Sequence, residues 1–278
     1  MRDKEKKELD ALVKAQGSSI QKVPGGLVKR GLEDVLYHLK HIVEDLDQDS
    51  SQIDPNDPNA FIYRGIAYAK KGDYDRAIVD FSRALQIIPY FAQAYNDRGI
   101  AYAEKGDYDR AIADYSQALQ IDPNPAQVYN NRGIAYYEKG DYDRAIVDFN
   151  NALRIDKNVS IAYYYRGLSY YYKGDFDRAI KDFSHALRID ASYAYAYYRR
   201  GNAYHYKDDD DRAIADYSSA LQIDPNNTQF YSTRGFAYVR KGDKLNARRD
   251  FQRAADLGDE DAKGVLEELR RRHGEADA

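Results

Sequence analysis

The dipeptide Arg-Gly recurs every 34 residues along most of this 278-residue chain. It stands at 30–31, 64–65, 98–99, 132–133, 166–167, 200–201 and 234–235. Self-similarity at a fixed period of roughly 20–50 residues is typical of solenoid proteins, in which each repeat contacts mainly its neighbours. The period constrains the fold more than any other feature, because every local inference must hold for all copies at once.

Two stripes of side chains within each period show helical spacing. Counted from Pro58, an aromatic residue stands at position 4, glycine at position 8 and tyrosine at position 11, on one face of a helix. Alanine at position 20, an aromatic residue at 24 and alanine at 27 form a second stripe. We therefore expect two helices per repeat, with large aromatic side chains packed over small residues.

Turn-forming residues separate the two stripes. Gly-Asp pairs follow the first stripe in five repeats, as in Gly72-Asp73. Glycine can take the left-handed conformation that ends a helix, and aspartate can cap the next helix. In the fifth repeat Asp208 and Asp210 replace the usual glycine and tyrosine. Aspartate tolerates the left-handed conformation better than most residues, so we expect a solvated turn over 207–211.

Arginine at position 7 and aspartate at position 23 recur in all six units. The arginines run from Arg64 to Arg234, and the aspartates from Asp80 to Asp250. Two structural interpretations stay open. The side chains form a ladder of Arg–Asp pairs, or the arginine stems lie on apolar surface with their heads in water.

These stretches resemble the tetratricopeptide repeat (TPR) family. The segments that carry the resemblance include Tyr129-Asn-Asn-Arg-Gly-Ile-Ala-Tyr136 and Gly140-Asp-Tyr-Asp-Arg-Ala-Ile146. Six repeats are in register, at 58–91, 92–125, 126–159, 160–193, 194–227 and 228–261. The sequence departs from the family pattern, because tyrosine or phenylalanine replaces tryptophan at position 4 and arginine replaces leucine at position 7. The resemblance implies an all-α, right-handed superhelical solenoid of antiparallel helix pairs.

The two ends differ from the repeats. Ala262, Val265, Leu266 and Leu269 share one face of a predicted helix, so we expect a capping helix and tail over 262–278. Residues 1–57 are predicted as an N-terminal helical extension, which would be a degenerate repeat, a cap or a self-docking arm. Asp34, His38, His41 and Asp45 fall near one helical face, but an exposed charged face explains them better than a metal site.

Composition excludes several classes of function. The chain has no cysteine, which rules out disulfides, thiolate nucleophiles and cysteine-built zinc or iron–sulfur sites. The formal net charge of -4 gives no electrostatic reason to expect nucleic acid or an anionic membrane as partner. No apolar run could span a bilayer, and residues 1–7 lack the apolar core of a secretory signal. We expect a cytoplasmic protein that is not an enzyme and needs no cofactor or metal.

The family resemblance implies that the first helices line a concave groove that binds peptides or protein segments. The candidate partner-binding residues on these helices are Asn96, Asn130, Tyr164, Tyr171, Tyr172, Tyr195, Tyr198, Asn202 and Tyr206. Amides can pair with the backbone of an extended peptide, and tyrosines offer large contact areas with a hydroxyl group. These tyrosines could instead only pack between neighbouring helices.

The leading hypothesis is therefore a non-catalytic scaffold that binds a protein or peptide segment in the groove. Relatives that clamp the C-terminal carboxylate of a chaperone use lysine at position 5 and asparagine at 9, asparagine at 6 in the next repeat, and lysine at 2 and arginine at 6 in the third. Here position 5 is never lysine and no three successive repeats assemble that set, so such a clamp is not expected. The alternative is a self-assembling homo-oligomer, in which the N-terminal helices of one copy dock into the groove of another. Binding of single-stranded nucleic acid would need a positive groove that the asparagines and tyrosines do not provide.

Overall fold

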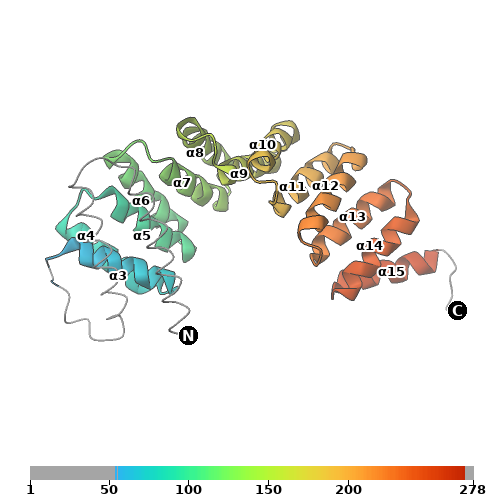
Figure 1. Cartoon of the computed structure of the whole chain (residues 1–278), viewed down its shortest axis with the longest axis horizontal. Helices are drawn as coiled ribbons and strands as arrows, with labels where there is room; N and C mark the ends of the chain where they lie inside the picture. Colours follow the sequence, from blue (N-terminus) through green and yellow to red (C-terminus); the bar gives the residue numbers. More distant parts are fainter. Residues whose placement is uncertain (1–53, 55, 273–278) are drawn as a thin grey trace, which may run out of the picture. The chain divides into compact units, whose positions relative to one another are not determined.

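The computed structural model describes residue 54 and residues 56–272 of the chain, which form thirteen α-helices and no strand (Figure 1). The helices are α3 (Pro58–Lys70), α4 (Tyr74–Ile87), α5 (Ala92–Glu104), α6 (Tyr108–Ile121), α7 (Ala126–Glu138), α8 (Tyr142–Ile155), α9 (Ser160–Tyr172), α10 (Phe176–Ile189), α11 (Ala194–Tyr206), α12 (Asp210–Ile223), α13 (Thr228–Arg240), α14 (Lys244–Asp256) and α15 (Glu260–Arg272). The chain divides into two compact units, 1–121 and 122–278, and each is described by itself.

The order of the helices confirms an all-α solenoid of consecutive helix pairs. In each pair the odd-numbered helix, α3 to α13, is the first helix and the following even-numbered helix is the second. Almost all of the extension predicted over 1–57 lies outside the described residues, and so do Asp34, His38, His41 and Asp45. At the other end α15 packs Ala262 and Leu266 against Phe251 of α14, as expected for a capping helix.

The turns within the pairs follow the chemistry predicted from the sequence. Gly72, at φ +78°, ends α3 in the left-handed conformation. The side chain of Asp73 then accepts a hydrogen bond from the Arg76 backbone N–H and caps α4. In the fifth repeat Asp208 takes the same conformation at φ 60°, and Asp209 caps α12. The substitution of glycine by aspartate thus leaves the turn intact.

Each pair is closed by an aromatic ring that lies directly on a glycine. A Cβ atom placed on Gly133 would lie 2.8 Å from Cε1 of Phe149, far inside van der Waals contact. The equivalent distance is 2.7 Å for Gly65 on Phe81 and for Gly201 on Tyr217. All six rings at position 24 are buried, as are the alanines at positions 20 and 27. The small residues therefore set the close approach of the two helices.

The Arg–Asp ladder expected as one of two possibilities is present in all six pairs. In each, Nε and Nη2 of the position 7 arginine donate hydrogen bonds of 2.6–2.8 Å to the two carboxylate oxygens of the position 23 aspartate. The side chains are largely buried, with 18% of Arg166 and 6% of Asp182 exposed. Two-pronged, desolvated contacts of this kind are among the stronger polar interactions in proteins.

The same arginines also join one pair to the preceding pair. Nη1 of Arg98 donates to the hydroxyl of Ser82 at 3.0 Å, and Nη1 of Arg200 donates to Ser184 at 2.9 Å. On the surface, lysines form ion pairs with aspartates 30 residues earlier in the chain. These pairs are Lys105 with Asp75, Lys173 with Asp143, Lys207 with Asp177 and Lys241 with Asp211. Each therefore links two neighbouring helix pairs.

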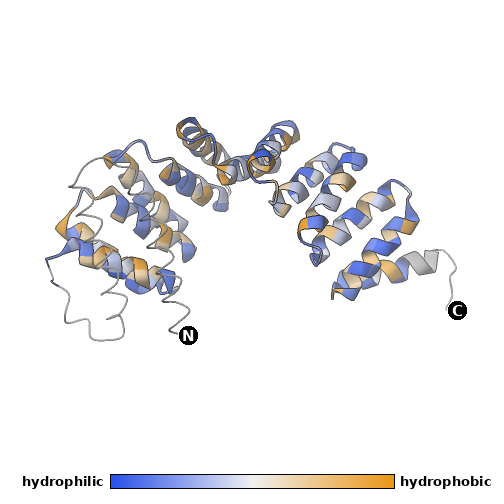
Figure 2. Cartoon of the chain, in the orientation of Figure 1, coloured by the Kyte–Doolittle hydropathy of each residue, from blue (hydrophilic) through white to orange (hydrophobic). Residues whose placement is uncertain are grey.

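Every helix carries both hydrophilic and hydrophobic residues along its length (Figure 2). Such banding is expected for helices that bury one face against neighbours and leave the other in water. Among the described residues, none of the helices has the length and apolar character needed to cross a membrane.

We expect the ladder to be energetically coupled. In a double-mutant cycle, Arg166→Leu and Asp182→Asn should show an interaction free energy of about 1.5–3 kcal/mol, because the pair is two-pronged and desolvated. Chemical denaturation of the four proteins measures it. The exposed pair of Lys173 and Asp143 provides the control and should give less than about 1 kcal/mol. Equal coupling in the two cycles would contradict the prediction.

The contact between glycine and the aromatic ring gives a second prediction. Gly133→Ala should lower the free energy of unfolding by about 1–3 kcal/mol, because its methyl group collides with the buried ring of Phe149. Gly264→Ala in α15 is the matched control. No neighbouring atom lies within 4 Å of a Cβ placed there, so alanine should not destabilise the helix. Comparable destabilisation by both changes would show that helix backbone effects, not the close approach, decide the outcome.

Candidate functional site

The first helices of the second unit are unusually rich in tyrosine. Helix α9 contains six tyrosines and α11 contains five. Helix α9 contacts the first helices on either side of it, α7 and α11. Tyrosines that the repeat spaces one period apart are therefore brought together on adjacent helices.

Eight aromatic rings in this region form one continuous contact network, which we call the tyrosine wall. Its members are Tyr137, Tyr142, Tyr164, Tyr165, Tyr171, Tyr172, Phe176 and Tyr206. Two stacked pairs bridge successive helix pairs. Tyr142 stacks on Tyr172 with ring centroids 5.4 Å apart, and Phe176 stacks on Tyr206 at 5.2 Å. All eight rings are carried by the five consecutive helices α7 to α11.

The candidate tyrosines differ sharply in exposure. Tyr172, Tyr195 and Tyr206 are exposed, with 48%, 46% and 62% of their surface accessible. Tyr171 is half-buried, whereas Tyr164 and Tyr198 are buried. Tyr195 and Tyr198 belong to a second group of rings, where both contact Phe230 of α13. The buried members shape the surface, and the exposed members are those that can contact a partner.

The three candidate asparagines are all buried. Asn202 accepts a hydrogen bond of 2.9 Å from the hydroxyl of Tyr217, a contact internal to one helix pair. Asn96 lies in the other unit, where its amide donates to Asp97. Asn130, on α7, has a buried Oδ1 atom without a hydrogen-bond partner among the described residues. The amides that were expected to pair with a peptide backbone are thus buried within the repeats.

Several groups on the first helices are not among the candidate residues. Tyr137 and Tyr165 belong to the tyrosine wall, and Phe236 of α13 is 52% exposed. Phe236 borders a hollow of about 520 Å³ between α13 and α15, which Thr233 and Val265 also line. Arg199 of α11 lies among the tyrosines at position 6 of its repeat. The signal was available, because positions 6 and 12 also lie near the inward face of the first helix.

Burial affects the hydroxyls of the wall. It raises the pKa of Tyr137 and of Tyr171, each of which also hydrogen-bonds a neighbouring tyrosine. Burial likewise raises the pKa of Tyr164. These hydroxyls therefore stay protonated at neutral pH and can donate hydrogen bonds to an acceptor on a ligand.

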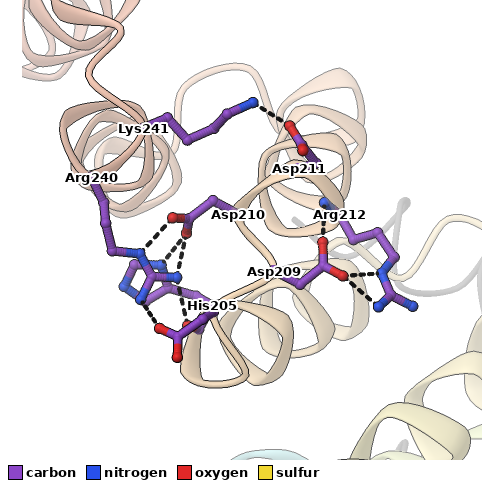
Figure 3. Close-up of polar contacts among 8 residues, drawn as sticks. His205, Asp209, Asp210, Asp211, Arg212, Arg240 and Lys241 are labelled. Carbon is purple, nitrogen blue, oxygen red and sulfur yellow. Dashed lines mark hydrogen bonds and ion pairs between the residues drawn. The ribbon is translucent and has the colours of Figure 1, made fainter.

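The edge of the wall changes from aromatic to ionic at the last helix pairs. Tyr142 stacks on Tyr172, and one period later Phe176 stacks on Tyr206. One further period along the chain, the same two positions hold Asp210 and Arg240, which form an ion pair (Figure 3). Nε and Nη2 of Arg240 donate to the two oxygens of Asp210 at 2.5 and 2.6 Å. His205 contacts the same carboxylate through Nδ1 at 2.7 Å, and Nη1 of Arg240 reaches Asp208 at 2.9 Å.

The contacts among His205, Asp208, Asp210 and Arg240 form an ionic cluster. The expectation of a fully solvated turn over 207–211 is therefore wrong in part. Asp208 and Asp211 are exposed, as expected, but Asp210 is buried. Arg240 arrives from the next helix pair, 30 residues later in the chain, and covers it. Within the part of the chain that the structure describes, no group of three or more histidine, cysteine, aspartate or glutamate side chains is arranged to hold a metal ion.

The cluster should contribute to stability in a pH-dependent way. Burial opposes ionisation of Asp210, but hydrogen bonds from Arg240 and His205 prevail and lower its pKa below the usual 3.8. Asp210→Asn should therefore cost about 1–3 kcal/mol at neutral pH. A group with a lowered folded-state pKa stabilises the fold above its unfolded pKa and loses that effect as the pH falls through the folded value.

Denaturation of wild type and Asp210→Asn across a pH series measures this difference. The difference in the free energy of unfolding between the two proteins should stay constant near neutral pH. It should disappear only as the pH falls below 3.8. Asp211→Asn is the control, because its ion pair with Lys241 is exposed and should be worth less than about 1 kcal/mol. A gap that persists unchanged in acid would mean that the carboxylate charge is not what stabilises the cluster.

Comparison with known proteins agrees with the helix-pair architecture. Family models match the chain as a "Tetratricopeptide repeat" at residues 58–91 and 126–159, and as a "TPR repeat" at residues 101–140, 167–208 and 201–242. No curated protein sequence matches the chain at a significant level.

Solved structures with the same architecture include three that illustrate its range. MamA is 30% identical, with a TM-score of 0.56 over 59% of this chain and 96% of that chain. PilF from Pseudomonas aeruginosa is 20% identical, with a TM-score of 0.66 over 77% and 97%. YrrB, described as a TPR protein with an unusual peptide-binding site, is 21% identical, with a TM-score of 0.56 over 69% and 95%. The repeat in the sequence, the helix pairs and these matches agree, and the chain belongs to the tetratricopeptide-repeat family.

Proposed function

We propose that this chain is a non-catalytic interaction scaffold that binds an extended segment of another protein along the first helices of the second unit. The observation that carries the proposal is the row of exposed aromatic side chains on three successive first helices. Tyr172 lies on α9, Tyr195 and Tyr206 on α11, and Phe236 on α13. Tyrosine and phenylalanine are enriched at the centres of protein interfaces, where they bury large areas at low entropic cost.

The interior of the repeats supports the same proposal. The glycine contacts and the Arg–Asp ladder are satisfied without any of the exposed rings. Large aromatic side chains in water stabilise a monomer little, and several of them exposed on neighbouring helices are typical of a binding site. Family membership adds weight, since repeats of this family generally serve protein interaction.

The test compares two multiple variants as baits for partners in a native lysate. Tyr195→Ala/Tyr206→Ala/Phe236→Ala removes three of the four exposed rings and leaves Tyr172 in place. Val147→Ala/Leu245→Ala removes equally exposed apolar side chains from second helices α8 and α14. A partner identified with wild type should bind the first variant at least about tenfold more weakly and the second unchanged, because aromatic anchors carry most of the energy of an interface.

Both variants should still unfold cooperatively above the temperature of the binding assay, which would show that the loss is one of binding and not of folding. A partner that both variants retain, or both lose, would place binding elsewhere on the molecule. Recovery of untagged copies of the same chain, competed by a peptide of residues 1–57, would replace the proposal with self-assembly.

A further inference from the structure

The hollow of about 520 Å³ between α13 and α15 exposes an aromatic ring that the fold could have covered. Phe236 is 52% exposed there, although its ring lies edge-on against the buried ring of Phe251, with ring centroids 5.0 Å apart. At the same repeat position, position 9, Leu168 of α9 and Asn202 of α11 are buried. The step from α13 to α15 therefore leaves open a position that is covered in the two preceding first helices.

The lining of the hollow combines apolar and polar groups. Phe236 and Val265 supply apolar surface, and Thr228, Ser232 and Thr233 supply hydroxyl groups that can accept hydrogen bonds. A pocket with apolar surface and a few polar groups suits a ligand group with an apolar body and a polar end. Long basic side chains have this form, because a chain of methylene groups carries the charged head.

The charge of the hollow is negative. Asp259, Glu260 and Asp261 line it, and no basic side chain does. Asp259 caps α15 by accepting a hydrogen bond from the Ala262 backbone N–H, and the hydroxyl of Ser232 donates to it at 2.7 Å. The hydrogen bond from Ser232 lowers the pKa of Asp259, so this carboxylate is ionised at neutral pH. By contrast, the first helices α9, α11 and α13 contain no aspartate or glutamate.

The chain itself neutralises these carboxylates only weakly. Glu260 accepts a hydrogen bond from Lys263 at 2.6 Å, but both side chains are exposed, so the pair is worth little. Asp261 is exposed and forms no ion pair among the residues that the structure describes. The three carboxylates are also not arranged to share a metal ion, as far as the described residues extend. A cation that reaches them must therefore be carried on a longer arm.

We propose that the hollow between α13 and α15 binds a basic side chain, arginine or lysine, of the segment that occupies the first helices. The inference rests on the proposed function and adds the chemistry of one ligand residue. The methylene stem lies on Phe236 and Val265, and the charged head meets the carboxylates of residues 259–261. Arginine fits better than lysine, because its planar group can stack on a ring and bind a carboxylate through two hydrogen bonds.

The position of the hollow also gives the bound segment a direction. Acidic side chains are absent from α9, α11 and α13 and begin again at the turn before α15. A basic residue near one end of the segment is therefore drawn to the α15 end, while its apolar residues meet the exposed rings. The same negative charge disfavours phosphate groups, and hence nucleic acid.

The experiment begins with a random-peptide library displayed on phage and selected on the full chain. Peptides enriched by wild type should share an arginine or a lysine. Fluorescence anisotropy then compares the consensus peptide with an analogue that carries citrulline in place of the arginine, or acetyl-lysine in place of the lysine. These replacements keep the shape of the side chain and remove its charge. The neutral analogue should bind about tenfold more weakly, and the difference should shrink at high salt.

Glu260→Gln/Asp261→Asn should remove most of the difference between the charged and neutral peptides, and it spares the helix cap at Asp259. Asp143→Asn/Asp177→Asn is the matched control. It also removes two exposed carboxylates from first turns, those of α8 and α10, and should leave the difference unchanged. If the first variant fails to fold, Asp261→Asn alone changes one exposed side chain and gives the same test with a smaller effect.

The outcomes separate the two proposals. Peptides that depend on Tyr195 and Tyr206 but share no basic residue, or that bind as well in the neutral form, would overturn this inference and leave the scaffold proposal intact. A preference for the basic residue that persists in the Glu260→Gln/Asp261→Asn protein would place its recognition outside the hollow and would also overturn the inference. Absence of any peptide that depends on the exposed rings would overturn both proposals.

Discussion

The structure depends on one close approach, made six times, between a glycine on the first helix of a pair and an aromatic ring on the second. A Cβ atom on any of these glycines would lie within 3.0 Å of the ring, so the two helices can meet at this distance only where the side chain is absent. The arginine next to each glycine then lies within reach of the aspartate next to each ring. The polar ladder is therefore a consequence of the packing, and it locks the same register that the packing sets.

Contacts between successive pairs are less uniform than contacts within them. The residue at position 17 meets the residue at position 13 of the next repeat. Tyr74 donates a weak hydrogen bond of 3.5 Å to Glu104, Tyr142 stacks on Tyr172, and Asp210 forms an ion pair with Arg240. The same pair of positions thus forms a hydrogen bond in one repeat, a stacked ring pair in another and an ion pair in a third. Because the repeat core carries the register, this edge of the first helices is free to vary, and each variation changes the surface that a partner would meet.

Most of the fold could be predicted from the sequence because it is periodic. The glycine turns, the helix caps and the Arg–Asp spacing repeat six times, and a local pattern repeated in register is a strong signal. Burial at the candidate site could not be predicted in the same way. Tyr198 is buried by Phe230 and Tyr217 from neighbouring helices, and Asp210 is covered by Arg240, 30 residues later in the chain. These contacts depend on which residue the next repeat places opposite, and the pattern of a single repeat contains no information about that.

The same reasoning explains why Arg199 was not among the candidate residues. A periodic sequence draws attention to the positions that repeat, and position 6 does not repeat. Its residues are Tyr63 and Asp97 in one unit and Asn131, Tyr165, Arg199 and Thr233 in the other. Positions that repeat satisfy the needs of the fold, which are the same in every copy. Arg199 occurs once at this position. It is half-buried, it hydrogen-bonds the hydroxyl of Tyr164, and its Nε atom is buried without a hydrogen-bond partner. In a solenoid, a buried polar group that breaks the period is therefore satisfied by the residues of its own and the next repeat, as Asp210 is by Arg240, and not by the contacts that every copy shares.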